Sequence, residues 1–241
     1  FIDNESEGMN SWVPVGYGGG LYADTCTLEV TDNTFAGNVA WEGSGIYALF
    51  SSLTITGNNF TGHEGYRGGA ISSYDGFDHE IRDNIITDNY SGINCHGVNA
   101  VVTDNLVADN SGDVHCGGIQ LYSENGLISG NTVTGNQGRA CGGIIGSNDT
   151  LITGNFVSGN FATDDDPITG GGILTGRDTV IHDNVITDNE SAGFGGGLSM
   201  VYSAAGSGSV TVTGNLISGN TARYSGGGIY HENGGPSLIN G

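Results

Sequence analysis

Three side chains in the middle of the chain have the types needed for acid–base chemistry. They are Asp75, His96 and Glu124. Two carboxyl groups, one with a raised and one with an ordinary pKa, are sufficient to hydrolyse a glycosidic bond, and an imidazole can exchange protons near neutral pH. If the fold brings them together, the sequence predicts a catalytic groove around His96.

A second set of residues favours binding of a sugar. It consists of aromatic and amide side chains that fall one or three positions after the aliphatic residue of a repeated glycine cluster: Tyr47, Tyr74, Asn94, Gln120 and Tyr122. Aromatic rings and amides suit a sugar, which offers an apolar face and hydroxyl groups at its edge. The alternative is that tyrosine is simply a common strand residue.

Acidic residues suggest a cation site. Asp83 aligns with Asp104, and Asp88 with Asp109, on adjacent repeats, where like charges repel unless a cation bridges them. Oxygen ligands suit Ca²⁺. A further acidic cluster is Asp164, Asp165 and Asp166. We therefore expect either no cofactor or Ca²⁺, and the alternative is a set of solvated turn residues in a halophilic protein.

Two of the four cysteines occupy equivalent positions. Cys116 and Cys141 each stand three residues before the aliphatic residue of a glycine cluster on neighbouring repeats. Stacked strands would bring their Cα atoms within disulfide range. The sequence leaves a disulfide and a pair of buried thiols as alternatives.

The element that must position these residues is a short repeat. The pattern Val-Thr-Asp-Asn-Leu-Val-Ala-Asp-Asn at 102–110 recurs as Ile-Ser-Gly-Asn-Thr-Val-Thr-Gly-Asn at 128–136, and each unit is followed by a glycine cluster such as Gly117-Gly118-Ile119. Spacings of 21 to 31 residues between the first Asn residues of successive units indicate short strands joined by turns of variable length. The residue before each Asn is Gly or Asp, which predicts a left-handed bend. Asn residues in register can form hydrogen-bonded ladders.

This pattern resembles the right-handed parallel β-helix repeat family, the pectate-lyase-like superfamily. The pairing of Phe35–Asn38 with clusters such as Gly68–Ile71 is also similar to repeats of polymorphic outer-membrane proteins and other surface adhesins. The resemblance implies an all-β, single-stranded parallel β-solenoid of about nine coils over residues 1–241. It also implies that the strand after each glycine cluster forms the ligand face. Related polygalacturonases use paired Asp residues, a Gly-His-Gly and an Arg-x-Lys. Cys95-His96-Gly97 is similar only to the middle motif of that set, since the chain has no Lys and no aligned Asp pair precedes this motif.

The composition of the chain limits the classes of ligand that it can bind. The 241 residues include 26 Asp and Glu, five Arg and no Lys, and the formal net charge is −21. This charge argues against binding of nucleic acid or anionic lipid, and no apolar run suggests membrane insertion. Both ends fall within a repeat, so we expect a fragment of a longer chain or a unit that associates end to end.

The lengths of the connections between repeats predict where the groove lies. The connection from Asn89 to Ile93 is short, whereas Glu5–Val15 and Phe161–Thr169 are long and should form walls on either side. The sequence thus predicts an extracellular or cell-surface solenoid that binds polysaccharide or serves as an adhesin scaffold. The alternatives are a polysaccharide lyase or glycoside hydrolase acting near His96, and an ice-binding or purely structural rod, which aligned Thr columns suggest.

Overall fold

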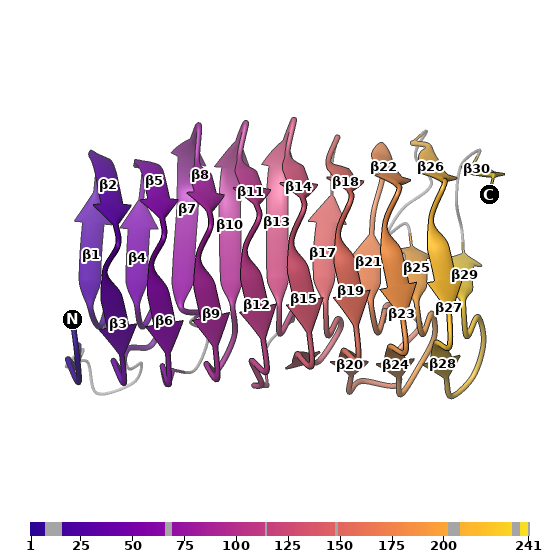
Figure 1. Cartoon of the computed structure of the whole chain (residues 1–241), viewed down its shortest axis with the longest axis horizontal. Helices are drawn as coiled ribbons and strands as arrows, with labels where there is room; N and C mark the ends of the chain where they lie inside the picture. Colours follow the sequence, from indigo (N-terminus) through magenta and orange to yellow (C-terminus); the bar gives the residue numbers. More distant parts are fainter. Residues whose placement is uncertain are drawn as a thin grey trace.

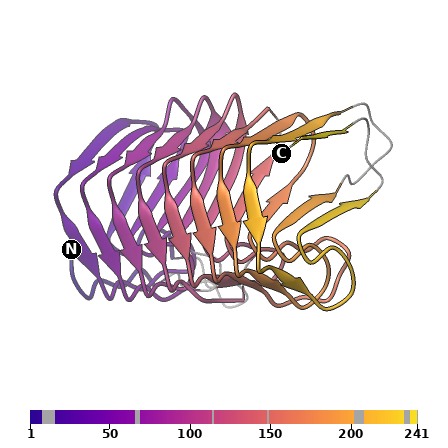
Figure 2. The same cartoon turned by 45° about the vertical axis from the view of Figure 1, so that its right-hand side comes forward.

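The computed structural model describes residues 1–7, 16–65, 69–113, 115–147, 149–201, 208–232 and 237–240. Residues 8–15, most of the first expected wall, lie outside this part. The described residues form thirty short β-strands and no helix. Successive coils stack side by side along one axis, with the N- and C-terminal ends at opposite ends of the stack (Figures 1 and 2).

The strands assemble into four parallel sheets, one along each side of the stack. The first sheet contains β1 (Leu21–Asp24), β4 (Ile46–Leu49), β7 (Ile71–Phe77), β10 (Ile93–Val98), β13 (Ile119–Glu124), β17 (Ile144–Ser147), β21 (Ile173–Thr175), β25 (Leu198–Val201) and β29 (Ile229–Glu232). The second contains β2 (Thr27–Thr31), β5 (Ser52–Thr56), β8 (Glu80–Arg82), β11 (Val101–Thr103), β14 (Leu127–Ser129), β18 (Leu151–Thr153), β22 (Thr179–His182), β26 (Val210–Thr213) and β30 (Ser237–Asn240).

The other two sheets are built from shorter strands. The third contains β3 (Thr34–Ala36), β6 (Asn59–Thr61), β9 (Ile85–Thr87), β12 (Leu106–Ala108), β15 (Thr132–Thr134), β19 (Phe156–Ser158), β23 (Val185–Thr187) and β27 (Leu216–Ser218). The fourth contains β16 (Gln137–Gly138), β20 (Phe161–Ala162), β24 (Glu190–Ser191) and β28 (Thr221–Ala222). Nine strands in each of the first two sheets and eight in the third are close to the predicted number of coils, and the right-handed parallel β-solenoid is confirmed.

The bends between sheets use the left-handed backbone that the sequence predicts. All seventeen residues that precede a ladder position, sixteen of them before Asn and Gly62 before His63, have positive φ angles, between 51° and 69°. At most Asp positions the next coil carries Gly, and the Asp carboxylate occupies the space that a Cβ there would need, as Asp104 does over Gly130. The carboxylate of one coil thus disfavours a side chain on the next, and the exceptions are Asp83 before Asp104 and Asp88 before Asp109.

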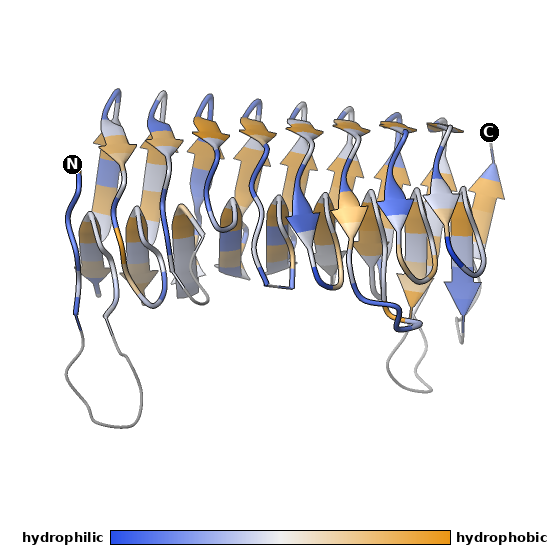
Figure 3. Cartoon of the chain, turned by 90° about the horizontal axis from the view of Figure 1, so that it is seen from below, coloured by the Kyte–Doolittle hydropathy of each residue, from blue (hydrophilic) through white to orange (hydrophobic). Residues whose placement is uncertain are grey.

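The interior of the solenoid is a column of aliphatic side chains. β-branched residues of the second sheet are buried in it, for example Ile128 and Ile152, and the third sheet adds residues such as Val133 and Val157. At the N-terminal end Phe1, Phe35 and Phe60 stack with ring centroids 4.5 and 4.7 Å apart. Hydrophobic bands recur at the same place on successive strands (Figure 3), so each coil buries its apolar face only against its neighbours.

Two asparagine ladders fix the register of the coils. In the first, Oδ1 of Asn131 accepts hydrogen bonds from the backbone N and the Nδ2 of Asn105, both at 3.0 Å. The same pair of bonds repeats along both ladders, and the Nδ2 groups also donate to backbone carbonyls. Almost every polar atom of these buried amides is therefore partnered, as low-polarity surroundings require.

The second ladder has one different residue, His63. Its Nδ1 accepts a hydrogen bond from the backbone N of Asn38 at 3.0 Å, and its own backbone N donates to Oδ1 of Asn89. Its buried Nε2 has no hydrogen-bond partner among the described residues. Burial lowers the His63 pKa from 6.5 to about 4. His63 is thus a neutral imidazole that makes only some of the hydrogen bonds that an Asn makes at this position of the ladder.

Candidate functional site

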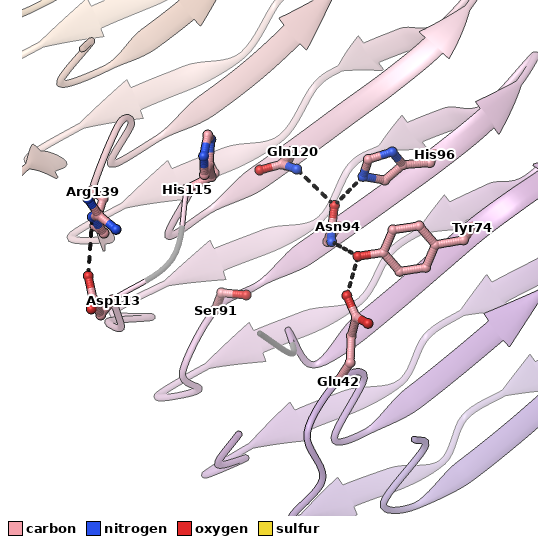
Figure 4. Close-up of a pocket in the computed structure, with 10 residues that line it drawn as sticks. Glu42, Tyr74, Ser91, Asn94, His96, Asp113, His115, Gln120 and Arg139 are labelled. Carbon is pink, nitrogen blue, oxygen red and sulfur yellow. Dashed lines mark hydrogen bonds and ion pairs between the residues drawn. The ribbon is translucent and has the colours of Figure 1, made fainter. Parts of the chain in front are cut away.

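A pocket of about 480 Å³ lies on the outer face of the first sheet (Figure 4). Strands β7, β10 and β13 form its floor, and the connections before β4, β10 and β13 and after β16 form its rim. The lining residues are Glu42, Tyr74, Ser91, Asn94, His96, Asp113, His115, Cys116, Gln120 and Arg139. Ser91 belongs to the short connection between Asn89 and Ile93, so the pocket lies where the loop lengths predict a low coil.

The floor of the pocket contains a β-bulge. Ser73 of β7 pairs with Cys95 of β10, but the next pair is Gly76 with Gly97, so Tyr74 and Asp75 together lie opposite His96. Asp75 adopts the left-handed conformation with φ of 52°. A bulge bends its strand and redirects the neighbouring side chains. It therefore sets the direction in which Tyr74 projects from the sheet.

A chain of hydrogen bonds crosses the pocket from Glu42 to Gln120. The Tyr74 hydroxyl donates to the Glu42 carboxylate, and Asn94 Nδ2 donates to the Tyr74 oxygen at 2.7 Å. Gln120 Nε2 donates to Asn94 Oδ1 at 3.1 Å. Because a carboxylate only accepts, each proton in the chain points toward Glu42. Burial and the adjacent Glu42 carboxylate raise the Tyr74 pKa strongly, so the phenol keeps its proton.

His96 enters the same chain as a donor. Its Nε2 lies 3.0 Å from Asn94 Oδ1, an acceptor, so Nε2 carries the proton and Nδ1 is the basic nitrogen of the neutral ring. Burial lowers the His96 pKa, while the Asp75 carboxylate opposes that shift. At neutral pH His96 is therefore an uncharged base at the edge of the pocket.

The predicted tyrosines and His96 form one aromatic row along the first sheet. Ring centroids are 5.7 Å apart for Tyr22–Tyr47, 5.8 Å for Tyr47–Tyr74, 4.7 Å for Tyr74–His96 and 4.9 Å for His96–Tyr122. Two of these pairs are stacked, so their ring faces are turned toward each other. The other two pairs, Tyr47–Tyr74 and His96–Tyr122, are tilted.

Tyr47 is the most enclosed member of the row. It is 7% exposed, and Tyr17 lies against it with ring centroids 4.7 Å apart. Burial, with the Glu42 carboxylate, raises its pKa to about 12. Tyr47 and Tyr122 therefore support the row from either side, whereas Tyr74, Asn94 and Gln120 line the pocket.

The rim carries charged residues that sequence reasoning missed. Arg139 Nε lies 3.3 Å from Asp113 Oδ1 and 3.2 Å from Asp164 Oδ2, and so links two loops of neighbouring coils. Glu42 and His115 complete the ionisable part of the lining. These residues stand on connections whose lengths vary, so alignment of the repeats does not bring them into one column.

The two predicted catalytic carboxylates are not among the lining residues. Asp75 is exposed at the bulge, close enough to His96 to affect its pKa. Glu124 is exposed at the end of β13, opposite Val98. The carboxylates that do line the pocket are Glu42 and Asp113.

Two of the residues expected to bind calcium have an arginine as partner, and two others line a second hollow. Asp83 pairs with Arg82 at 3.1 Å, and Asp164 pairs with Arg139. Asp88 and Asp109 line a second hollow of about 720 Å³. Within the described ranges no group of three or more His, Cys, Asp or Glu side chains is placed to hold a metal ion. In this part of the chain, no coordinating group therefore surrounds the residues for which a calcium site is expected, which are Asp83, Asp88, Asp104, Asp109, Asp164, Asp165 and Asp166.

The predicted stacking of two cysteines is observed. Cys116 and Cys141 are directly opposite each other in a parallel bridge. Both are free thiols, and their Sγ atoms donate to the carbonyls of Ile119 and Ile144 at 3.3 and 3.2 Å. The structure thus contains the pair of buried thiols, not the disulfide, of the two alternatives.

The comparisons with known proteins identify the family. The model of the right-handed β-helix region matches residues 19–174 and 117–241, which together cover most of the chain. The chain therefore belongs to the right-handed β-helix family. No curated protein and no solved structure matches it. In the described part of the chain there is no helix long and apolar enough to cross a membrane.

Proposed function

We propose that this chain binds a saccharide in the pocket over β7, β10 and β13. The observation that carries the proposal is the hydrogen-bond chain from Glu42 through Tyr74 and Asn94 to Gln120. Each of these side chains is held by its neighbour, so a ligand would meet polar groups that are already oriented. Preorganised polar groups lose little conformational freedom when a ligand binds.

The size and chemistry of the pocket support the same proposal. Its volume of about 480 Å³ falls within the range of small-molecule sites. Carboxylate, amide and imidazole groups surround it, and these are suitable partners for the many hydroxyl groups of a sugar. The aromatic row adds an apolar element beside them.

We further propose that the chain acts outside the cell or at its surface, as a polysaccharide-binding module or adhesin scaffold. The β-helix fold is consistent with surface or carbohydrate-related roles. A net charge of −21 keeps such an exposed rod soluble and apart from anionic lipid.

A glycan-binding screen followed by calorimetry on one variant tests the proposal. Asn94→Ala removes the central member of the hydrogen-bond chain and should weaken binding by about tenfold or more. Thr103→Ala, on the outer face of the second sheet, is the matched control and should bind as the wild type does. Equal binding by both variants, or no binding of any glycan by the wild type, would contradict the proposal.

A second candidate is a carbohydrate-active enzyme, and one observation favours it. Neutral His96 shares the pocket with the carboxylates of Glu42 and Asp113, the types of group that acid–base cleavage of a glycosidic bond requires. An enzyme would release reducing ends or unsaturated products from a bound glycan. His96→Gln would then abolish turnover while most of the binding is kept, whereas a binding module shows no product with either protein.

A further inference from the structure

A buried histidine contacts both ends of the bulge in β7 from inside the solenoid. His79 Nε2 lies 2.7 Å from Ser73 Oγ, and Ser73 is the residue just before the two that lie opposite His96. A Cβ at Gly76, the residue just after those two, would overlap with the imidazole ring of His79. The His79 side chain thus spans the bulge, with a hydrogen bond at one end and close packing at the other.

Stability of the core alone does not account for an imidazole at this position. The preceding coil carries Leu53 at the equivalent place and the following coil carries Ala100, both fully buried. His79 is 1% exposed, and its Nδ1 has no hydrogen-bond partner among the described residues. Burial lowers the pKa of His79 to about 4, so the ring carries no charge near pH 7. A buried polar atom without a partner destabilises the folded state, whereas the hydrogen bond to Ser73 is a contact that leucine cannot make.

On the outer face, the two bulged residues act on the pocket. The Tyr74 hydroxyl donates to Glu42 and accepts from Asn94, so its position fixes the middle of the hydrogen-bond chain (Figure 4). The Asp75 carboxylate opposes the lowering of the His96 pKa by burial. Because a bulge redirects the side chains that it carries, the direction of Tyr74 and Asp75 depends on the geometry of the backbone between Ser73 and Gly76.

We propose that His79 is a positioning residue for the saccharide pocket. Its hydrogen bond with Ser73 holds the bulge in the geometry that directs Tyr74 into the pocket and Asp75 toward His96. This inference rests on the proposed function, although His79 itself lies inside the solenoid. Loss of the bond frees Ser73 from the imidazole, so the bulge changes its geometry and the two side chains change their directions.

Substitutions at position 79 separate the hydrogen bond from the packing. His79→Leu fills the space without the bond, and calorimetry with the highest-affinity oligosaccharide of the glycan screen should show about tenfold weaker binding. His79→Gln carries a donor and an acceptor at a similar distance from Cα, and should restore most of the wild-type affinity. In His79→Asn the amide is too short to reach Ser73, so this variant should behave as His79→Leu does.

An NMR titration without any ligand gives a readout that a purely structural role would not change. Because Asp75 favours protonated His96, the His96 pKa should fall in His79→Leu and stay at the wild-type value in His79→Gln. Ser73→Ala breaks the same bond from the other side, so it should have the same effect, and the double variant should show no greater one. His63→Asn, which replaces another buried histidine, is the control and should leave the His96 pKa unchanged.

The outcomes separate the role of His79 from the proposed function. An unchanged His96 pKa in His79→Leu and Ser73→Ala overturns the positioning role, and Ser73→Ala carries this test by itself if His79→Leu does not fold. An equal loss of affinity in His79→Gln and His79→Leu also overturns it, because the loss then does not follow the hydrogen bond. Absence of glycan binding by the wild type overturns the proposed function, while the titration still decides whether His79 holds the bulge.

Discussion

Replacement of His63 by asparagine should stabilise the solenoid. His63 is the single non-Asn rung among the described residues of the two ladders, and its buried Nε2 has no partner there. In His63→Asn, Nδ2 should donate to Asn89 Oδ1, and the new Oδ1 should accept from both donors of Asn38, as at every equivalent rung.

The expected gain follows from the groups that change. A buried polar group without a partner costs about 1–3 kcal/mol, and each new hydrogen bond contributes about 0.5–1.5 kcal/mol. Loss of the edge contact with Phe60, whose ring centroid is 6.2 Å from that of His63, offsets about 0.5–1.5 kcal/mol. The variant should therefore be more stable by about 1–3 kcal/mol at pH 7.

The gain should grow as the pH falls. The His63 pKa is about 4 in the folded chain and 6.5 when unfolded, so the unfolded state binds more protons between these values. A difference of one in pKa corresponds to about 1.36 kcal/mol, so His63 lowers the stability of the wild type by about 2 kcal/mol between pH 6.5 and 5. The wild type therefore loses no stability through His63 well above pH 6.5, and the loss reaches its full size at about pH 4.

Urea unfolding at pH 7 and pH 5, at constant ionic strength, measures both effects. His182→Asn, which removes a half-exposed histidine from β22, is the control and should follow the wild type. If His63→Asn has the same stability difference between the two pH values as the wild type, the reasoning about this rung is refuted.

Two further changes test other parts of the structure. Asn131→Ala leaves the buried backbone N of Asn105 without a partner and removes the hydrogen bonds that the Asn131 amide makes with Asn105 Nδ2, Asn155 Oδ1 and two backbone carbonyls. Urea unfolding should therefore show a loss of about 3–5 kcal/mol, and a loss below about 1 kcal/mol would contradict the ladder. Asp75→Asn removes the negative charge that favours protonated His96, so an NMR titration should give a still lower His96 pKa. An unchanged titration would mean that the bulge does not place Asp75 beside the ring.

Much of the fold could be predicted from the sequence because a solenoid turns alignment into contact. Once residues such as Asn105 and Asn131 are aligned, stacking makes them neighbours, and both the ladders and the bends follow. The same logic brings Tyr74, His96 and Tyr122 into one row. The bulge at Asp75 could not be predicted, since an extra residue within a strand is indistinguishable from a longer turn.

The candidate site could be predicted only in part, for a physical reason. Asn94 and Gln120 lie at aligned strand positions and line the pocket as expected. Glu42, Asp113 and Arg139 come from connections of different lengths, and their meeting depends on how each loop folds over the sheet. A search for oppositely charged residues on neighbouring connections would have suggested Asp113 and Arg139.

Hydrogen–deuterium exchange with a bound oligosaccharide tests the central claim most directly, because it locates the ligand without a mutation. The account predicts slower exchange at residues 91–96 and 115–120, and no change over the outer face of the third sheet, at residues 132–134 and 156–158. Protection confined to the third sheet, or to the hollow beside Asp88 and Asp109, would contradict the assignment of this pocket as the binding site.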